Sequence, residues 1–345
     1  MDFTLPERPQ AVADLAAQVL GAADPWKELA RAGLLDVSSP DGLGVLEVSV
    51  LLTEIGRRAP SMKPLATLMT GALPVLRWGN ADLKQALLPG VASGEILLTA
   101  ALREPSNPQP FPPATAVTDG KISGTKVGVP YAAESHLLLV PTHLSPADFM
   151  IAGSFGHIAA KSARDHGGVF LVNPREPGVE LIRTPSSSGE PEYAVRMDAA
   201  PIDGVLGGTD CVRDLYQLAV AGTCALADGA VAGALALTRD YVASREQFGR
   251  PLAAFQAVSQ QIADVYIASR TMHLAVLSAC WRLAESRDAA ADLAVAGCWC
   301  AEQAPRSVRL CHHLHGGIGM DVTYPLHRFS SLIADLTRYL PCSST

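Results

Sequence analysis

The strongest constraint on the fold is a change of periodicity along the chain. Residues 9–95 carry apolar side chains at i, i+3 and i+4 spacing, in runs such as "LEVSVLLTEIGRRA", and this spacing predicts helices. From about residue 96 the pattern gives way to short β-rich runs such as "SHLLLVPT" and "GGVFLV", separated by Pro, Gly and Ser. After about residue 208 the helical period returns in three long segments, at roughly 212–244, 253–286 and 288–315.

This order of segments predicts an α+β protein in three parts. We expect an N-terminal helical domain at 1–95, a middle β domain at 96–207 and a C-terminal domain at 208–345 whose helices pack as an antiparallel, four-helix-bundle-like unit. The 345 residues, of which 48% are hydrophobic, are enough for more than one core. The stretch 144–168 is long for a loop, and its role stays open.

Composition excludes several classes of function. The net charge is −7 and no stretch is densely basic, so we expect no binding of nucleic acid. The N-terminus "MDFTLPERPQAVADL" lacks the basic and apolar regions of a signal peptide. The long apolar run 215–237 contains Asp228 and several glycines, which favours a buried helix over a membrane span. The sequence therefore predicts a cytoplasmic protein that does not enter a membrane.

The cysteines favour the same compartment. Most of them lie in Ala/Leu-rich segments, as free, buried thiols do in a reducing environment. The "CWC" at 298–300 has no second CxxC pair, so we expect no zinc knuckle. The seven cysteines are Cys211, Cys224, Cys280, Cys298, Cys300, Cys311 and Cys342.

The stretch "RLCHHLHGGIG" at 309–319 raises the question of a metal site. His312 and His315 would share one face of a helix, whereas His313 would point elsewhere. No HExxH pattern and no nearby acidic ligand completes such a site, so we expect no metal. The glycines are explained either by capping of the helix or by a ligand that approaches the backbone closely, and the residues alone leave both open.

A second candidate site lies in "YVASREQFGRPLAAFQ" at 241–256. Gly249 and Pro251 must interrupt the helical pattern, so two helices are expected to meet in a tight turn. Arg245 then ends the first helix, Phe248 lies in the turn and Gln256 begins the second helix. A guanidinium, an aromatic ring and a carboxamide at a helix N-terminus suit a pyrophosphate and an adenine. An ordinary helical hairpin with a capping arginine is the alternative.

Together these two stretches carry a resemblance to a family. The pair "REQFGRPLAAFQ" (245–256) and "HLHGGIGMDVTYPLHR" (313–328), in that order and at that separation, resembles the C-terminal domain of acyl-CoA dehydrogenases. In addition, "WKELARAGLL" and "LTEIGRRA" look like the family's N-terminal helices, and "LKQALLPGVASGEILLTAALREP" looks like its entry into the β domain. The resemblance thus extends over nearly the whole chain.

The resemblance implies a cofactor and an arrangement of subunits. It implies FAD-dependent α,β-dehydrogenation of an acyl-CoA thioester, with electrons passed to an electron-transferring flavoprotein. It also implies that FAD lies at a subunit interface, where one subunit contacts the ADP part of its neighbour's FAD. His313 stands where the family usually has Gln, and imidazole can still donate one hydrogen bond there. The residues that match these contacts are Arg245, Phe248, Gln256, His313, Leu314, His315, Gly316 and Gly317.

The sequence departs from the family where the chemistry would take place. The family's catalytic glutamate falls at Leu340 by one spacing and at Ala219 by the other, so we expect no catalytic residue in this chain. Gly128 and Pro130 stand in place of the Trp and Thr that lie against the flavin ring. The Gly-rich acidic stretch beside the flavin is reduced to "TAALREPSNPQP". Loss of a positioned general base costs about 10²–10⁴ in rate.

We therefore expect a non-catalytic subunit of a heteromeric enzyme, which completes the FAD site of a homologous catalytic partner. The pattern resembles the base-lacking subunit of actinobacterial α2β2 acyl-CoA dehydrogenases, which implies a steroid (cholesterol) side-chain acyl-CoA as the substrate, held mainly by the partner. Two alternatives stay open. One is a self-sufficient homo-oligomer whose base is displaced, for example to Glu134, Asp214 or Asp335. The other is a binding or structural protein that kept only the fold.

Overall fold

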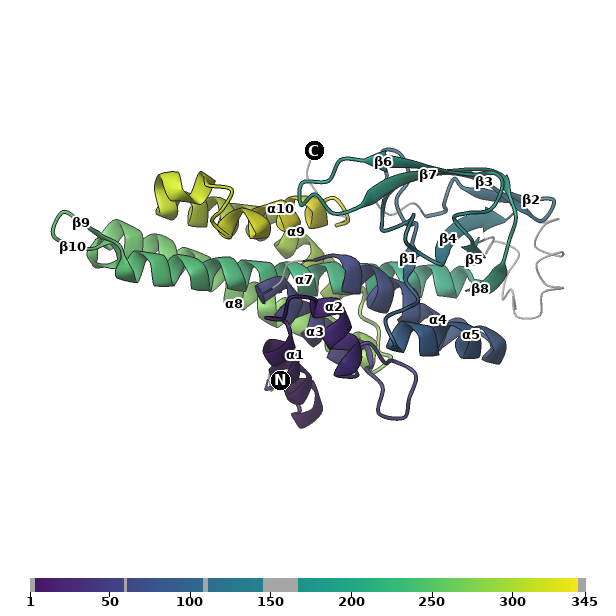
Figure 1. The fold of residues 1–345 in the computed structure, drawn as a ribbon, viewed down its shortest axis with the longest axis horizontal. Helices are drawn as coiled ribbons and strands as arrows, with labels where there is room; N and C mark the ends of the chain where they lie inside the picture. The colour runs from purple at the N-terminus through teal and green to yellow at the C-terminus, as the bar shows by residue number, and fades with distance from the viewer. Residues whose placement is uncertain (1–3, 59–60, 108–110, 145–166, 341–345) are drawn as a thin grey trace. The chain divides into compact units, whose positions relative to one another are not determined.

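The computed structural model describes residues 4–58, 61–107, 111–144 and 167–340, and its path is shown in Figure 1. Contacts between residues divide the chain into two compact units. We call Met1–Pro25, Leu46–Ser61 and Val220–Thr345 the helical unit, and Trp26–Val45 with Met62–Ala219 the sheet unit. The division into domains at 1–95, 96–207 and 208–345 stays a prediction. Most of the stretch 144–168 lies outside the described residues.

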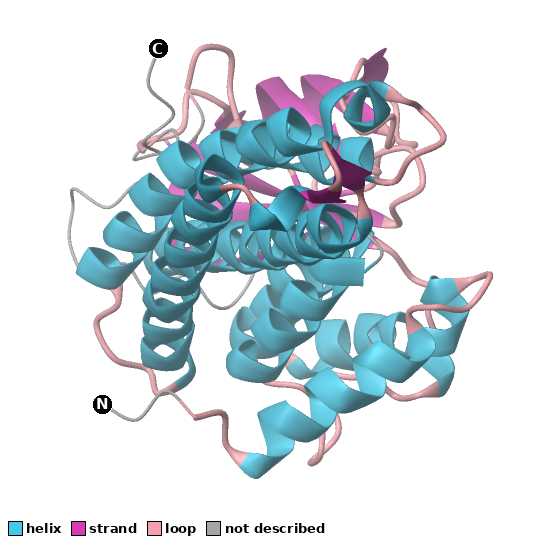
Figure 2. Cartoon of the chain, turned by 90° about the vertical axis from the view of Figure 1, so that its left-hand side faces the viewer, coloured by secondary structure: helices cyan, strands magenta, loops and turns pink. Residues whose placement is uncertain are grey.

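The helical unit is built around the three long helices that the sequence predicts. They lie close to the expected segments, and α8 packs along α9. Figure 2 marks the helices in cyan and the strands in magenta. The apolar face of α10 packs against α9 as well. The helices are α1 (Glu7–Val19), α3 (Val45–Arg58), α7 (Thr209–Ser244), α8 (Gln256–Ala284), α9 (Ala290–His315) and α10 (Leu326–Thr337). Its short elements are β9 (Glu246–Gln247), β10 (Arg250–Pro251) and the 3₁₀ turns η2 (Leu252–Ala254) and η3 (Gly316–Met320). The first part of α7, up to Ala219, belongs to the sheet unit.

Close contact between α3 and α7 explains why the apolar helix α7 carries glycines. A Cβ atom on Gly229 would lie 1.9 Å from the carbonyl oxygen of Thr53, so only glycine allows the two backbones to approach this closely. The Thr53 hydroxyl also donates to the carbonyl of Ala225 at 3.2 Å. An 18-residue window of α7 has a mean hydropathy of 1.6, enough for a membrane span, but 89% of it is buried. This confirms the predicted core helix.

The sheet unit contains an eight-stranded sheet and the shorter helices. Its strands follow the order β6-β7-β3-β2-β4-β5-β8, with β1 paired to β4. The strands are β1 (Leu98–Ala100), β2 (Ala116–Thr118), β3 (Lys121–Pro130), β4 (Leu137–Leu144), β5 (Gly167–Val172), β6 (Val179–Thr184), β7 (Glu192–Ala200) and β8 (Gly204–Gly208). The helices are α2 (Pro25–Arg31), the π-helix η1 (Leu65–Ala72), α4 (Leu73–Trp78) and α5 (Ala81–Ala92). The α+β fold class is thereby confirmed.

The core of the sheet unit follows the predicted β-rich runs. In the antiparallel pair of β4 and β5, Leu138 lies opposite Val172 and Val140 lies opposite Phe170, so alternate side chains meet on one face. These four side chains are almost fully buried. The strands β2 and β8 have no counterpart among the predicted runs, because β2 has three residues and β8 reads "GVLGG".

The cysteines agree with the sequence analysis except at one position. Cys211, Cys224, Cys280, Cys300 and Cys311 are free and buried, as predicted. Cys298 is disulfide-bonded, so the prediction of free thiols is wrong there. A cysteine's surroundings in sequence show its burial but not whether a second sulfur comes within reach in the fold. Cys342 lies outside the described residues.

Candidate functional site

The predicted tight turn after Arg245 is a β-hairpin. Strand β9 pairs with β10, and Gln247 lies opposite Arg250. The two residues between them, Phe248 and Gly249, both have positive φ, at 53° and 79°. This is the geometry of a type I′ turn, for which glycine in the second position is favoured. The chain therefore folds here into a projecting hairpin between α7 and α8, and not into a simple helix-to-helix corner.

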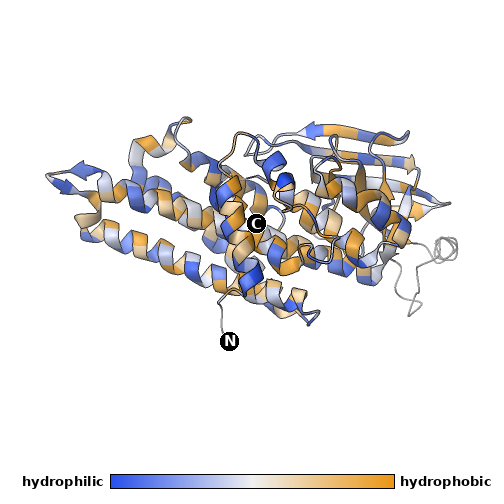
Figure 3. Cartoon of the chain, turned by 60° about the horizontal axis from the view of Figure 1, so that its bottom comes forward, coloured by the Kyte–Doolittle hydropathy of each residue, from blue (hydrophilic) through white to orange (hydrophobic). Residues whose placement is uncertain are grey.

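The hairpin presents its functional groups to the outside of the chain. Phe248 is 92% exposed, and its ring meets only the edge of Phe255, with 6.2 Å between ring centroids. Arg245 and Gln256 are exposed too, and within the described part of the chain the guanidinium of Arg245 has no ion pair. Figure 3 shows the hairpin strands as hydrophilic. A projecting aromatic ring beside an uncompensated guanidinium is poor packing for an isolated subunit and good geometry for an interface.

The glycine turn at the end of α9 offers an open backbone. Gly316 caps the helix at φ 63°, and its N–H bonds to the carbonyls of His312 and His313, as a C-cap requires. A Cβ atom on Gly316 or on Gly317 would meet nothing within 4 Å. His313, Gly316 and Gly317 are exposed. Capping thus explains Gly316, whereas Gly317 leaves free space from which a ligand can reach the backbone.

A cluster of three rings ties the glycine turn to the end of α7. The imidazole of His315 stacks on Tyr241 at 4.5 Å between centroids, and its Nε2 lies 3.0 Å from the hydroxyl of Tyr324. The hydroxyl of Tyr241 donates to the carbonyl of His315 at 3.3 Å. Because Tyr241 lies one helical turn before Arg245, the cluster holds both halves of the candidate site together. We call the hairpin 245–256 and the turn 313–317, joined in this way, the arm.

Two of the predicted contact residues face inward. His315 is 3% exposed and its Nδ1 bonds to the carbonyl of Cys311 at 2.8 Å, so both ring nitrogens have partners within the chain. Burial lowers the pKa of His315, outweighing the hydrogen bond to Cys311. Leu314 is buried as well. These two residues can therefore contribute only their backbone to a ligand, whereas Arg245, Phe248, Gln256 and His313 can offer side chains.

Two of the three histidines of this stretch are used in packing, and His313 is exposed. His312 lies 3.0 Å from the hydroxyl of Ser330 on α10, and the partners of His315 are given above. Among the residues that the structure describes, no group of three His, Cys, Asp or Glu side chains is placed to hold a metal ion.

The stretch that departs from the family pattern contains a buried ion pair in the sheet unit. Lys126 of β3 is completely buried, and its ammonium donates to Glu104 at 2.8 Å. The same carboxylate accepts from the backbone N–H groups of Ala114 and Thr115 and from the Thr115 hydroxyl, at 2.8 to 2.9 Å. Burial alone would raise the pKa of Glu104, but these hydrogen bonds and the Lys126 charge lower it. Four hydrogen bonds from the chain itself thus reach this carboxylate, three at Oε1 and one at Oε2.

Gly128 and Arg103 lie close together in the same region. Gly128 has φ 63°, and a Cβ atom there would lie 2.5 Å from the guanidinium of Arg103. Arg103 also bridges to β3 through a backbone hydrogen bond from Val127, at 2.9 Å. A tryptophan at position 128, as in the family pattern, is therefore incompatible with Arg103 where it stands. The residues present fill this space instead of opening it for a ring.

No carboxylate stands at either position of the family's base. Leu340 is fully buried and Ala219 is 7% exposed, both among apolar neighbours. Of the displaced acids, Asp214 accepts from Trp78 at 2.7 Å and pairs with Arg77 at 2.5 Å. Asp335 is fully buried and pairs with Arg338 at 2.8 Å. Both acids are therefore occupied in structural ion pairs.

Comparison with known proteins decides the family. Residues 208–335 match the model of the acyl-CoA dehydrogenase C-terminal domain, and residues 7–95 match that of the N-terminal domain. The chain is 45% identical to acyl-CoA dehydrogenase FadE28 of Mycobacterium tuberculosis, over 99% of this chain and 95% of the relative. The chain belongs to the acyl-CoA dehydrogenase family.

Solved structures of other acyl-CoA dehydrogenases share the whole fold. The ChsE4-ChsE5 complex from Mycobacterium tuberculosis matches with a TM-score of 0.86 at 29% identity, over 98% of this chain and 94% of that one. A steroid acyl-CoA dehydrogenase variant, Tcur3481-Tcur3483, matches with a TM-score of 0.84 at 31% identity, over 97% and 94%. The predicted arrangement of helices, sheet and helices in an acyl-CoA dehydrogenase fold is thereby confirmed.

FAD is the cofactor of this family, as the sequence analysis predicted. The arm fits it: a guanidinium without an ion pair, an exposed aromatic ring and an open glycine turn are the donor set that a pyrophosphate and an adenine require. Around Glu104 and Lys126, by contrast, the polar groups are buried and paired with each other.

Sequence reasoning missed the residues that organise these two regions. Tyr241 and Tyr324 are not reactive groups in themselves. Tyr241 lies four residues before the motif 245–256, however, and Tyr324 lies within the motif 313–328. Lys126 gave a clearer signal, because a lysine within a β-rich run must either reach solvent or find a buried acid. Its partner Glu104 lies in the stretch that the sequence analysis described only as reduced.

Proposed function

We propose that this chain is the non-catalytic subunit of a heteromeric, FAD-dependent acyl-CoA dehydrogenase. Its arm completes the FAD site of a homologous catalytic subunit in an α2β2 assembly, and the partner supplies the glutamate base, the flavin-ring pocket and most of the substrate site. Residues Arg245, Phe248, Gln256 and His313 bind through their side chains, and the turn from Leu314 to Gly317 binds through its backbone. No residue of this chain takes the α-proton.

One contrast carries this proposal. The arm holds its binding groups exposed and unpaired, whereas the ring side of the same chain is filled by the Glu104 and Lys126 pair. A self-sufficient enzyme needs both regions open. A subunit that only completes its neighbour's site needs the arm alone. The ion pairs of Asp214 and Asp335 also leave neither acid free to act as a displaced base, and Glu134, the third position suggested, is exposed.

The chain's contribution to catalysis is binding and orientation. When bound, FAD accepts a hydride from the β-carbon of the thioester. The guanidinium of Arg245 is placed to neutralise pyrophosphate charge with paired N–H donors, and Gln256 is placed to donate from the start of α8. Phe248 offers an aromatic face to the adenine. Held by the ring cluster around His315, these groups fix one end of the cofactor and hence the position of its ring in the partner.

For the substrate class, the proposal draws on the similar proteins. The structural neighbour described as a steroid acyl-CoA dehydrogenase supports a steroid acyl-CoA, from the cholesterol side chain, as the substrate. Two of the similar structures, ChsE4-ChsE5 and Tcur3481-Tcur3483, each combine two different chains, which supports a homologous partner subunit. Electrons would leave to an electron-transferring flavoprotein in the cytoplasm, and neither nucleic acid nor a membrane is a partner.

Co-expression with a homologous dehydrogenase that carries an intact glutamate tests the assembly. We expect a yellow heteromer that contains about half the FAD of a homotetramer, and a colourless product when this chain is expressed alone. A yellow homo-oligomer of this chain, whose flavin is reduced by an acyl-CoA, would refute the proposal.

Substitution Arg245→Ala tests the arm within that heteromer. Hydrogen bonds to charged groups contribute about 1.5–3 kcal/mol, so FAD should bind about 10- to 100-fold more weakly. Because Arg245 is exposed, the thermal stability of this chain should not change. Arg306→Ala, at an exposed position of α9, is the matched control and should retain FAD fully. If the two variants hold FAD equally, the arm does not contact the cofactor.

A further inference from the structure

The helical unit contains a cavity that the arm and the flavin chemistry do not use. It measures about 220 Å³ and lies among α1, α3, α7 and α8. Its lining comprises an apolar set, which we call the apolar end, a charged set, which we call the polar end, and in addition Gln10, Ser49, Thr53 and Cys280. The apolar end is formed by Leu5, Ala13, Val50, Ala225, Val276 and Leu277. The polar end is formed by Glu54, Arg57, Asp228 and His273.

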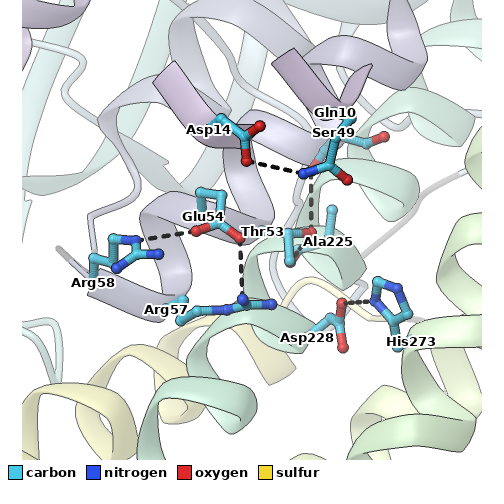
Figure 4. A network of polar contacts seen from close by, with 10 residues as sticks. All are labelled: Gln10, Asp14, Ser49, Thr53, Glu54, Arg57, Arg58, Ala225, Asp228 and His273. Carbon is cyan, nitrogen blue, oxygen red and sulfur yellow. Dashed lines mark hydrogen bonds and ion pairs between the residues drawn. The ribbon is translucent and has the colours of Figure 1, made fainter. Parts of the chain in front are cut away.

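The charged side chains of the polar end contact one another (Figure 4). The carboxylate of Asp228 is 2% exposed and lies 2.7 Å from Nδ1 of His273. Arg57 pairs with Glu54 at 3.2 Å, and its guanidinium is directed toward Asp228. Glu54 has a second partner in Arg58, at 3.0 Å. Each of the two acids thus has a basic partner within the chain: Glu54 pairs with Arg57 and Arg58, and Asp228 pairs with His273.

One donor in this set is left without a partner. The Nε–H of Arg57 is buried and makes no hydrogen bond within the described residues. A buried donor atom without a partner is unfavourable, so a ligand that accepts from it gains affinity. Since the neighbouring Asp228 carboxylate can only accept, a group that both accepts from Arg57 and donates to Asp228 fits best. A hydroxyl group is the smallest group that does both.

The volume of the cavity limits the size of the ligand that carries this hydroxyl. A single water needs about 10–15 Å³, and an apolar cavity of about 150 Å³ suffices for benzene. The space here is therefore large enough for a six-membered ring with a substituent. Access is available because Arg57, Asp228 and His273 also line a second hollow of about 660 Å³ between α7 and α8.

We propose that this cavity binds a small, uncharged alcohol of about one ring in size, with its hydroxyl between Arg57 and Asp228 and its ring against the apolar end. The site is independent of the proposed role in FAD binding, since it involves none of the arm residues. It gives the helical unit a ligand-dependent stability, because a compound that binds only the folded state stabilises it by mass action.

Cyclohexanol is the probe, with cyclohexanone as its matched partner. Both are titrated calorimetrically into the full-length protein, in the assembly in which it purifies, and both are soaked into its crystals. We expect cyclohexanol to occupy the cavity and to bind about tenfold more tightly than the ketone, which cannot donate to Asp228. Ordered water alone in the soaked crystal, or equal binding of the two probes, would overturn the proposal.

Two substitutions locate the binding. Ala13→Leu fills the apolar end and should abolish binding, whereas Ala11→Leu, at an exposed position of the same helix, should leave it unchanged. Arg57→Met removes the donor and should weaken cyclohexanol about tenfold, while Glu54 keeps its pair with Arg58. Melting temperatures show that each variant is folded. Cyclohexanol binding that survives Ala13→Leu in a folded protein would place the site elsewhere and refute the assignment.

Discussion

The arm and the ring side of this chain have opposite kinds of polar chemistry. In the arm, Arg245 and Phe248 are exposed, and the backbone at Gly317 is open. On the ring side, Glu104 and Lys126 satisfy each other inside the sheet unit. The polar groups of the arm can find partners only in a ligand or another subunit. The polar groups of the ring side already have partners within the chain and leave none for a ligand. Within one fold, therefore, one region can present exposed binding groups while another holds its polar groups inside the core.

The largest effect is expected from breaking the ring-side pair. Lys126→Met leaves the buried Glu104 without its cation and should destabilise the chain by about 3–5 kcal/mol, because a buried charge has lost its partner. Urea denaturation measures this loss. The matched control is Arg196→Met, which removes an exposed ion pair with Glu180 in the same sheet and should cost under about 1 kcal/mol. Equal losses would mean that the buried pair is not a structural element.

The same pair predicts a pH dependence. Burial lowers the pKa of Lys126 to about 8, against the opposing effect of Glu104. Between pH 8 and 10.5 the unfolded chain therefore holds a proton that the folded chain has released, so the free energy of unfolding should rise with pH across this window. Denaturation at pH 8 and pH 10 checks the sign. Lys126→Met should lack this rise.

Gly317→Val separates a packing role from a binding role in the arm. A Cβ atom at this position meets nothing of the chain, so the melting temperature should not change. In the heteromer the new side chain would occupy space that we assign to FAD, and overpacking of this kind costs about 1–3 kcal/mol. Fluorescence titration of FAD into the apo-heteromer measures the loss. Gly21→Val, at another open glycine, is the control and should leave FAD binding intact.

Arg245→Lys sharpens the assignment of the pyrophosphate contact. The charge is kept but the paired N–H donors of the guanidinium are lost, so FAD should bind less tightly, by about 1–2 kcal/mol. The same titration of the apo-heteromer reports this change. Unchanged affinity would indicate that a general positive charge, and not a two-point contact, is what Arg245 supplies.

The smallest effect is expected at His315. Its pKa is lowered, mainly by burial, so the folded chain binds a proton less readily than the unfolded chain. Its contribution is therefore constant above pH 6.5 and becomes destabilising as the pH falls below that value. Melting curves at pH 7.5 and 5.5 should show a drop that His315→Gln reduces. A pH response identical in both proteins would contradict the assignment.

The sequence predicted the fold well because periodicity is a local property. The run "SHLLLVPT" predicts a strand and the spacing after residue 208 predicts helices, each from residues close together in the sequence. The family motifs then indicated the order of the domains. The ring side could be recognised only by what it lacked, since the pairing of Glu104 with Lys126 joins residues 22 apart through the sheet. The burial of His315 also escaped the sequence, because it depends on Tyr241, 74 residues away.

The ring cluster of Tyr241, His315 and Tyr324 has a consequence for how the subunits meet. Because it joins two helix ends within one chain, the hairpin and the glycine turn are already in register before a partner arrives. Ordering of loops is one of the main entropic costs of association. A preorganised arm avoids part of that cost, so its affinity for the partner's cofactor can come from few contacts.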